Sequence, residues 1–109
     1  MSAWKRGFLE IIAEILESLM ANPLKKTHVT FKCNLDSRAV TKYLALMMYV
    51  GLVEQSKKDP TYYAITQKGM QYRNQFYSFV SIMEKDLESF NMKNNGPKKL
   101  IADLKMRRQ

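Results

Sequence analysis

Apolar residues recur at helical spacing in three stretches of the chain, and residues that stop helices separate these stretches. In the first stretch, glutamates occupy the other faces and Asn22-Pro23 ends the pattern. The apolar face consists of Phe8, Ile11, Ile12, Ile15, Leu16 and Leu19. This spacing predicts a helix from about Trp4 to Met20.

The second stretch has a start and a stop signal. Asp36 stands where an N-cap acceptor belongs, and Gly51 stands just beyond the last helical residue, where glycine is favoured. The apolar positions between them are Val40, Tyr43, Leu44, Met47 and Val50. We predict a helix from about Ser37 to Val50, whose opposite face carries Ser37, Arg38, Thr41, Lys42 and Ala45.

Residues 24–33 give a mixed signal. Val29, Phe31 and Cys33 alternate at period two, and Val, Thr and Phe are residues that favour strands. The pattern alone leaves a strand and a helix open.

A hairpin is expected after Gly51. Residues 52–56 and 61–65 resemble strands, and Lys57-Lys58-Asp59-Pro60 forms a polar turn between them. Thr66 is expected to cap a helix over residues 67–90, which the Asn-rich segment 91–97 ends. Residues 98–109 form a short basic amphipathic piece.

The order helix, short element, helix, hairpin, helix is that of a winged helix. In that order, residues 24–33 become the second helix. We therefore expect a mainly α (α+β) fold, a winged helix-turn-helix with a two-stranded wing and a long C-terminal coiled-coil helix. The expected division is a winged-helix domain (1–66), a dimerisation helix (67–90) and a basic tail (91–109).

The long helix carries an apolar stripe that a body of this size cannot cover along its whole length. A second copy of the helix would cover it, so we expect a homodimer. In an alternative, the first turns pack on the body and only residues 79–90 meet the partner. The stripe consists of Tyr72, Phe76, Phe79, Val80, Met83, Leu87 and Phe90.

Charge and composition narrow the classes of function. Lys and Arg number 18 against 10 Asp and Glu, a net charge of +8 that suits a polyanion such as nucleic acid. No set of catalytic residues, phosphate loop or metal-ligand spacing is present, so we expect neither an enzyme nor a cofactor, metal or small-molecule ligand. We also expect no secretory leader and no membrane span, hence a cytoplasmic, nucleoid-associated protein.

Four short motifs resemble one family. They are Lys-Thr-His-Val-Thr-Phe-Lys-Cys-Asn-Leu at 26–35, Lys-Tyr-Leu at 42–44, Gly-Leu-Val at 51–53 and Tyr-Ala-Ile-Thr-Gln-Lys-Gly at 63–69. Over residues 8–90 the chain is similar to archaeal winged-helix DNA-binding proteins of the crenarchaeal chromatin and transcription-regulator type. The resemblance implies DNA binding and dimerisation through an antiparallel coiled coil. Val29-Thr30-Phe31 departs from the usual Ile-Met-Tyr, and Cys33 replaces a common alanine.

The helix over 37–50 is the expected recognition helix in the DNA major groove. Arg38 is the candidate for reading guanine, with Lys42 on phosphate and the wing lysines clamping the backbone. Thr27 is either a contact or the N-cap of the second helix. The expected DNA-binding residues are Lys25, Lys26, Thr27, Lys32, Ser37, Arg38, Thr41, Lys42, Lys57 and Lys58.

Four other residues have a structural and a functional interpretation. Cys33 is expected to be a small buried side chain, with a thiol sensor as the alternative, and His28 is expected on a helix surface. Of Tyr62 and Tyr63, one should face the core and one the solvent.

The sequence therefore predicts a double-stranded-DNA-binding homodimer, either a transcriptional regulator or an architectural protein. The alternative is a winged-helix module that binds another protein. Binding of the 98–108 tail to an anionic membrane surface is a third, minor option.

Overall fold

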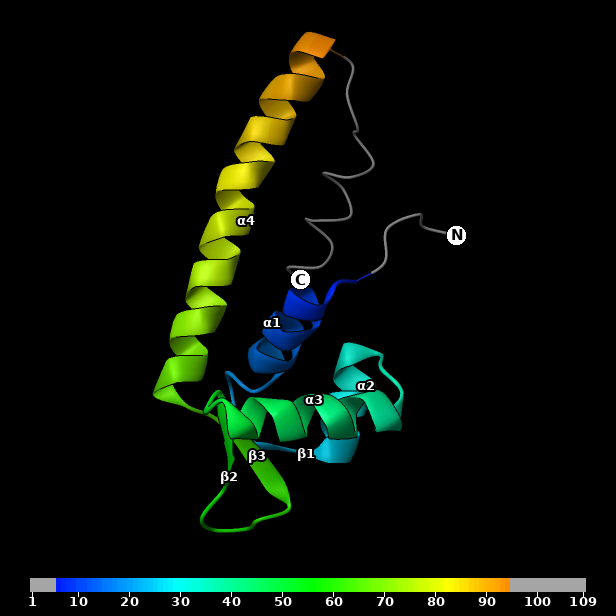
Figure 1. Cartoon of the computed structure of the whole chain (residues 1–109), viewed down its shortest axis with the longest axis vertical. Coiled ribbons are helices and arrows are strands. Elements are labelled where there is room, and N and C mark those ends of the chain that lie inside the picture. Colours follow the sequence, from blue (N-terminus) through cyan, green and yellow to red (C-terminus); the bar gives the residue numbers. More distant parts are fainter. Residues whose placement is uncertain (1–5, 95–109) are drawn as a thin grey trace. The chain divides into compact units, whose positions relative to one another are not determined.

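The computed structural model describes residues 6–94, with side chains described for residues 6–90. The order of elements is α1 (Phe8–Ser18), β1 (Leu24–Lys25), α2 (Lys26–Cys33), α3 (Ser37–Tyr49), β2 (Val53–Gln55), β3 (Tyr62–Ile65) and α4 (Gln67–Asn94) (Figure 1). The helical, hairpin and long-helix elements predicted from the sequence are all present. The first helix, predicted from about Trp4, begins only at Phe8, because Gly7 is its N-cap. The basic piece at 98–109 lies outside the described residues.

Helix α1 begins after Gly7, whose backbone N–H donates to Glu10 Oε1 at 3.1 Å. The carboxylate thus satisfies an otherwise unpaired amide and lies at the positive end of the helix dipole. Ile12, Ile15 and Leu16 are buried along the inner face of the helix. The predicted apolar face is confirmed in its centre, whereas Phe8 at its start is 53% exposed.

The segment with the mixed signal forms a helix preceded by a short strand. In α2, Val29 and Cys33 are buried four residues apart, while Phe31 between them is 87% exposed. The side chains therefore follow the helical period rather than the period of two that a strand would need. Asn34 ends the helix in the left-handed conformation at φ 51°, and the Leu35 N–H donates to the Thr30 carbonyl at 3.2 Å. Burial of Val29 in the core outweighs the strand propensity of the segment.

Helix α3 has the two end signals that the sequence predicts. Asp36 Oδ1 accepts from the N–H groups of Arg38 at 2.7 Å and Ala39 at 3.0 Å. At the other end, Gly51 takes φ 84° and the Leu52 N–H donates to the Met47 carbonyl at 2.8 Å. Glycine is suited to this left-handed turn because it has no Cβ to clash.

The sheet has one strand more than the predicted two-stranded wing. The strand order is β1-β3-β2 and both pairings are antiparallel, with Leu24 opposite Tyr63 and Val53 opposite Ile65. A two-residue strand such as β1 leaves too little pattern in the sequence to be recognised. It attaches the start of α2 to the wing.

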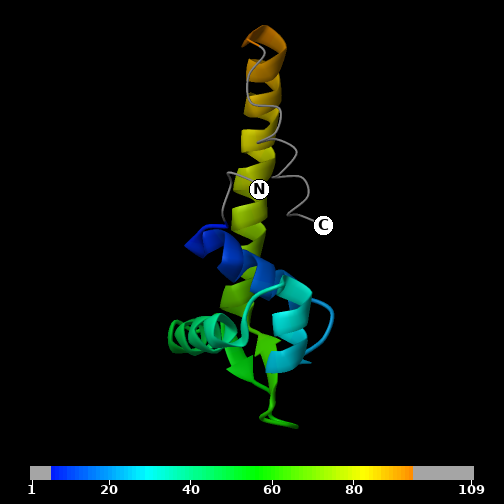
Figure 2. The same cartoon turned by 90° about the vertical axis from the view of Figure 1, so that its right-hand side faces the viewer.

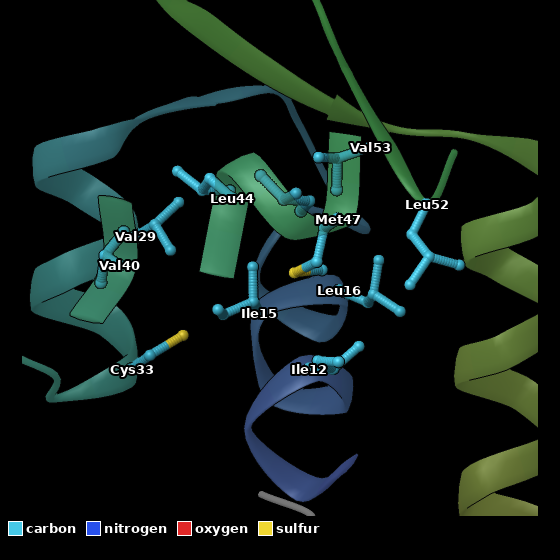
Figure 3. Packing of buried hydrophobic residues seen from close by; sticks show 11 residues of the cluster. Ile12, Ile15, Leu16, Val29, Cys33, Val40, Leu44, Met47, Leu52 and Val53 are labelled. Atoms are coloured by element: carbon cyan, nitrogen blue, oxygen red, sulfur yellow. The ribbon is translucent and has the colours of Figure 1, made fainter. Parts of the chain in front are cut away.

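One hydrophobic core joins α1, α2, α3 and the start of β2 (Figure 3). Eleven buried residues form it: Ile12, Ile15, Leu16, Leu19, Val29, Cys33, Val40, Leu44, Met47, Leu52 and Val53. Tyr63 packs against this cluster, as the alternation of Tyr62 and Tyr63 predicted for one of the two. Cys33 is buried as expected, and its thiol donates to the Glu14 carbonyl at 3.6 Å.

Helix α4 starts at the predicted cap. Thr66 Oγ1 accepts from the Gly69 N–H at 3.0 Å and donates to the Gly51 carbonyl at 2.6 Å. Gly69 lies so close to Leu52 that a Cβ there would overlap the Leu52 carbonyl oxygen. A side chain at residue 69 is therefore incompatible with this packing.

The first turns of α4 belong to the winged-helix body, which is one compact unit over Gly7–Arg73. Tyr72 packs against the core, and its hydroxyl donates to the Leu9 carbonyl at 3.3 Å. Burial raises the pKa of Tyr72. Arg73 forms an ion pair with Glu17.

The rest of α4, from Asn74, belongs to a second compact unit. The helix runs to Asn94, four residues beyond the end predicted at residue 90. Asparagine has a low helix propensity, but it does not prevent a helix from continuing. Among the helices of residues 6–94, none combines the length and apolar character needed to cross a bilayer.

Candidate nucleic-acid interface

Helix α3 has a buried face and a solvent face, and the predicted contact residues lie on the solvent face. Val40, Leu44 and Met47 are at most 2% exposed, so they fix the rotation of the helix about its axis. The exposed residues are Ser37, Arg38, Thr41, Lys42 and Ala45, as the sequence predicted. The rigid core thus holds a polar and basic helix surface outward.

Lys26 joins this surface from the neighbouring helix. Its Nζ donates to Thr41 Oγ1 at 2.8 Å, and Thr41 Oγ1 in turn donates to the Ser37 carbonyl at 2.9 Å. Helices α2 and α3 are in contact with each other, and Figure 2 shows both of them above the wing hairpin. The ammonium group has three N–H donors, so the bond to Thr41 leaves donors for a further acceptor.

Lys25 extends the basic surface towards the wing. It lies in β1 opposite Tyr62 of β3, and its Nζ is 5.5 Å from the centre of the Tyr62 ring. A cation held over an aromatic face keeps its charge at a defined place beside the sheet. The positive residues at the start of α2 therefore lie between the solvent face of α3 and the hairpin.

The wing tip is ordered by its acidic residue. Asp59 Oδ1 accepts from the Thr61 hydroxyl at 2.7 Å and from the Thr61 N–H at 3.0 Å. These bonds lower the pKa of Asp59, with a smaller contribution from the charge of Lys25. Lys57 and Lys58 are exposed on the same turn. Their exposure fits the predicted contacts.

Two other expectations concern α2. Thr27 is exposed, and the N-cap position is Lys25, so the prediction that Thr27 caps this helix was wrong. The helix starts two residues earlier because β1 leads directly into it. Lys32, in the last turn, and His28 are both exposed on the surface of α2.

The sequence reasoning missed exposed apolar residues at the C-terminal end of α3. Tyr49 is 89% exposed and Met48 is 38% exposed, although aromatic and long apolar side chains are usually assigned to the core. Helical spacing could have indicated this exposure. Tyr49 follows Ala45 by four residues and Lys42 by seven, so it lies on the same helix face as these two residues. These two residues extend the solvent face of α3 beyond the predicted contacts.

Within residues 6–94, no three His, Cys, Asp or Glu side chains come together as a possible metal site. The exposed surface of α2, α3 and the wing carries cations, hydroxyl groups and apolar side chains. Such a surface is chemically suited to an extended anionic partner.

The chain is similar to other proteins over most of its length. It is 28% identical over 80 residues to an uncharacterized protein of Methanocaldococcus jannaschii. The matched region covers 73% of this chain and 79% of the relative. Its structure resembles Sso10a-2, a DNA-binding protein from Sulfolobus solfataricus, with a TM-score of 0.65 and 27% identity over 81% of this chain and 92% of the other. It also resembles the transcriptional regulator BldR from Sulfolobus solfataricus, with a TM-score of 0.56 and 17% identity over 88% and 70% of the two chains.

The last likeness, at 17% identity, concerns the fold alone. The resemblance to archaeal winged-helix DNA-binding proteins predicted from residues 8–90 is confirmed by these matches. The family model for the winged helix-turn-helix matches residues 5–84, and the chain belongs to the winged helix-turn-helix family.

Proposed function

We propose that this protein binds double-stranded DNA as a homodimer, with α3 in the major groove. One observation carries the proposal: the outward face of α3 presents Arg38, Thr41 and Lys42 to solvent, and Lys26 is hydrogen-bonded alongside. An α-helix fits the major groove, and the N-terminal residues of a recognition helix reach base edges there. The similarity to Sso10a-2, a DNA-binding protein that matches along most of its length, supports the same function.

The contacts divide into base and backbone contacts. Arg38 reads a guanine through its O6 and N7 acceptors. Ser37 binds a base or phosphate oxygen, and Thr41, whose hydroxyl proton is donated to the Ser37 carbonyl, accepts from a base amino group. Lys25, Lys26 and Lys42 bind phosphates beside the groove. The free N–H groups at the start of α2, where Thr27 lies, attract a further phosphate.

Two basic regions extend the backbone contacts. Lys57 and Lys58 on the wing clamp a neighbouring phosphate, and Lys32 at the end of α2 adds positive charge. None of these three side chains carries sequence information in this arrangement. They raise affinity for any duplex.

The dimer forms through the part of α4 beyond the body. Phe79 is 60% exposed, Met83 is 37% exposed and Phe90 is 50% exposed, and all three lie on the predicted stripe. Full burial of such a side chain contributes about 1.5–3 kcal/mol, and each of these three has part of that still to gain. Phe76 and Leu87 are half-buried members of the same stripe.

Two stripe residues already have contacts inside a single chain. Tyr72 packs on the winged-helix body, and Val80 is only 6% exposed. We therefore place the centre of the interface at the exposed stripe residues within 79–90, namely Phe79, Met83 and Phe90, in the narrower of the two arrangements that the sequence allows. An antiparallel pairing follows from the family resemblance.

A salt series with a random duplex tests the function. Fluorescence anisotropy should give an affinity whose logarithm falls with the logarithm of salt concentration at a slope of about −5, if six phosphates are neutralised. The matched control is the variant Arg38→Ala/Lys42→Ala, which should weaken binding at every salt concentration. A protein that does not bind the duplex at low salt contradicts the proposal.

The exposed Phe31 on α2 favours a second candidate, a protein-binding surface. Phe31 is 87% exposed and lies beside the exposed residues His28 and Lys32. Its ring is therefore available to a protein partner. Under DNA binding alone, Phe31→Ser leaves duplex affinity unchanged. If the wild-type protein does not bind DNA and Phe31→Ser abolishes capture of a protein partner, the second candidate replaces the first.

A further inference from the structure

A narrow stripe on the solvent face of α3 changes character along the helix. Arg38, Lys42, Ala45 and Tyr49 follow one another at steps of four, three and four residues, so they fall within about 60° of the helix circumference. The first two are cations, and the last two are a methyl group and an aromatic ring. We call these four residues the α3 stripe.

The apolar half of the α3 stripe has no role in the core. Ala45 is exposed and Tyr49 is 89% exposed, while the opposite face is held by Val40, Leu44 and Met47. Because the buried face fixes the rotation of α3, Ala45 points in the same direction as Arg38. Any duplex that Arg38 touches therefore also faces Ala45.

The size of Ala45 restricts what it can recognise. Its side chain is a single methyl group, which neither donates nor accepts a hydrogen bond. A group this small allows the helix backbone to approach the base edges closely. On base edges in the major groove, the apolar group is the C5-methyl of thymine. Ala45 follows Arg38 by seven residues, or about 10 Å along the axis. This distance corresponds to about three base pairs at 3.4 Å per step.

We propose that Ala45 is a specificity-determining residue that selects thymine by contact with its C5-methyl, about three base pairs from the base read by Arg38. The inference rests on the proposed DNA binding and adds the base class that the site prefers. Tyr49 lies at the far end of the α3 stripe, where the helix leaves the groove. It contacts the sugar-phosphate backbone and so contributes affinity without base preference.

The test separates this inference from DNA binding itself. Duplexes bound by the protein are first selected from a random library, and each thymine of the selected site is then replaced singly by deoxyuridine, which lacks only the methyl. One thymine in each half-site should lose about fourfold in affinity on this change, the effect of about one buried methyl group. The remaining thymines should tolerate it.

Variants of two alanines on α3 assign the effect. Ala45→Gly removes the methyl group, so its affinities for the thymine and uracil duplexes should become equal. Ala39→Gly is the matched control, because it weakens the same helix by a similar amount but lies off the α3 stripe. It should keep the fourfold difference. Circular dichroism verifies that both variants are folded, and the ratio of affinities within each variant cancels any uniform loss.

Three outcomes contradict the inference, and they are distinguishable. Binding to random duplex with no thymine enriched in the selected sites overturns the inference and leaves the proposed function intact. A uracil effect of the same size in Ala45→Gly does so as well. Absence of any duplex binding overturns both.

Discussion

The ammonium group of Lys26 donates a 2.8 Å hydrogen bond to the hydroxyl of Thr41, and this bond links the start of α2 to the solvent face of α3. It holds a positive charge beside Arg38 and Lys42 before any partner arrives. Preorganised cations lose less side-chain freedom on binding than free ones. The packing of α2 against α3 thus fixes the position of one cation of the proposed interface.

Lys26→Met should therefore affect binding more than stability. The hydrogen bond is near the surface, so its loss should lower the free energy of unfolding by less than about 1 kcal/mol in urea titrations. The slope of log affinity against log salt should become shallower by about 1, as for one lost phosphate contact. Lys85→Met, an exposed lysine on α4, should leave the slope unchanged. A wild-type slope in Lys26→Met would place Lys26 away from DNA.

The wing lysines should act on all sequences alike. Lys57→Ala/Lys58→Ala removes two exposed charges and should weaken binding by a similar factor for every duplex, because phosphate contacts carry no sequence information. Anisotropy with several unrelated duplexes at low salt measures the factor. Unchanged affinity at low salt would mean that the wing does not touch DNA.

Gly69→Ala should destabilise the winged-helix body. A Cβ at this position overlaps the Leu52 carbonyl oxygen and lies 2.8 Å from Ile65 Cγ1, so backbone must move. The expected cost is about 1–3 kcal/mol in urea unfolding. Gly7→Ala is the control, because nothing lies within 4 Å of a Cβ there and the cost should stay at or below about 1 kcal/mol through a weaker N-cap. Equal effects of the two changes would show that the close approach at Gly69 is absent.

The dimer prediction concerns the apolar stripe of α4. Phe79→Glu/Met83→Glu places two like charges at the proposed interface and should give monomers with much weaker DNA binding. Both positions are exposed in the single chain, so the fold should survive. Sedimentation velocity at tens of micromolar measures the mass. Ser78→Glu/Ser89→Glu adds the same charges at exposed positions off the stripe and should remain dimeric. An unmutated protein that sediments as a monomer would remove the dimer from the account.

Local signals in the sequence were sufficient where one residue determines one backbone feature. Asp36 and Thr66 cap helices, and Gly51 takes a left-handed turn, because each has chemistry that few other residues share. Segment 24–33 could not be decided in this way, since its β-branched and aromatic residues favour a strand while the core requires Val29 and Cys33 on one helical face. Only the order of the surrounding elements indicated a helix there.

Prediction of the candidate site from the sequence was limited because some of its contacts join residues that are far apart in the sequence. The polar half of the α3 face followed from periodicity, but the bond between Lys26 and Thr41 joins residues of two helices and leaves no local pattern. Tyr49 was missed because aromatic residues are usually buried, and only the positions of its neighbours show that it is not. The N-cap alternative for Thr27 failed because β1 leads into α2 two residues earlier, after Lys25.

The most direct test of the central claim is duplex affinity of Arg38→Ala/Lys42→Ala beside the wild-type protein, measured by fluorescence anisotropy at low salt. Both side chains are exposed on α3, so the variant should fold normally. The account predicts a loss of at least about tenfold, since a good base contact and a phosphate contact disappear together. Wild-type affinity in this variant would contradict the placement of α3 in the major groove.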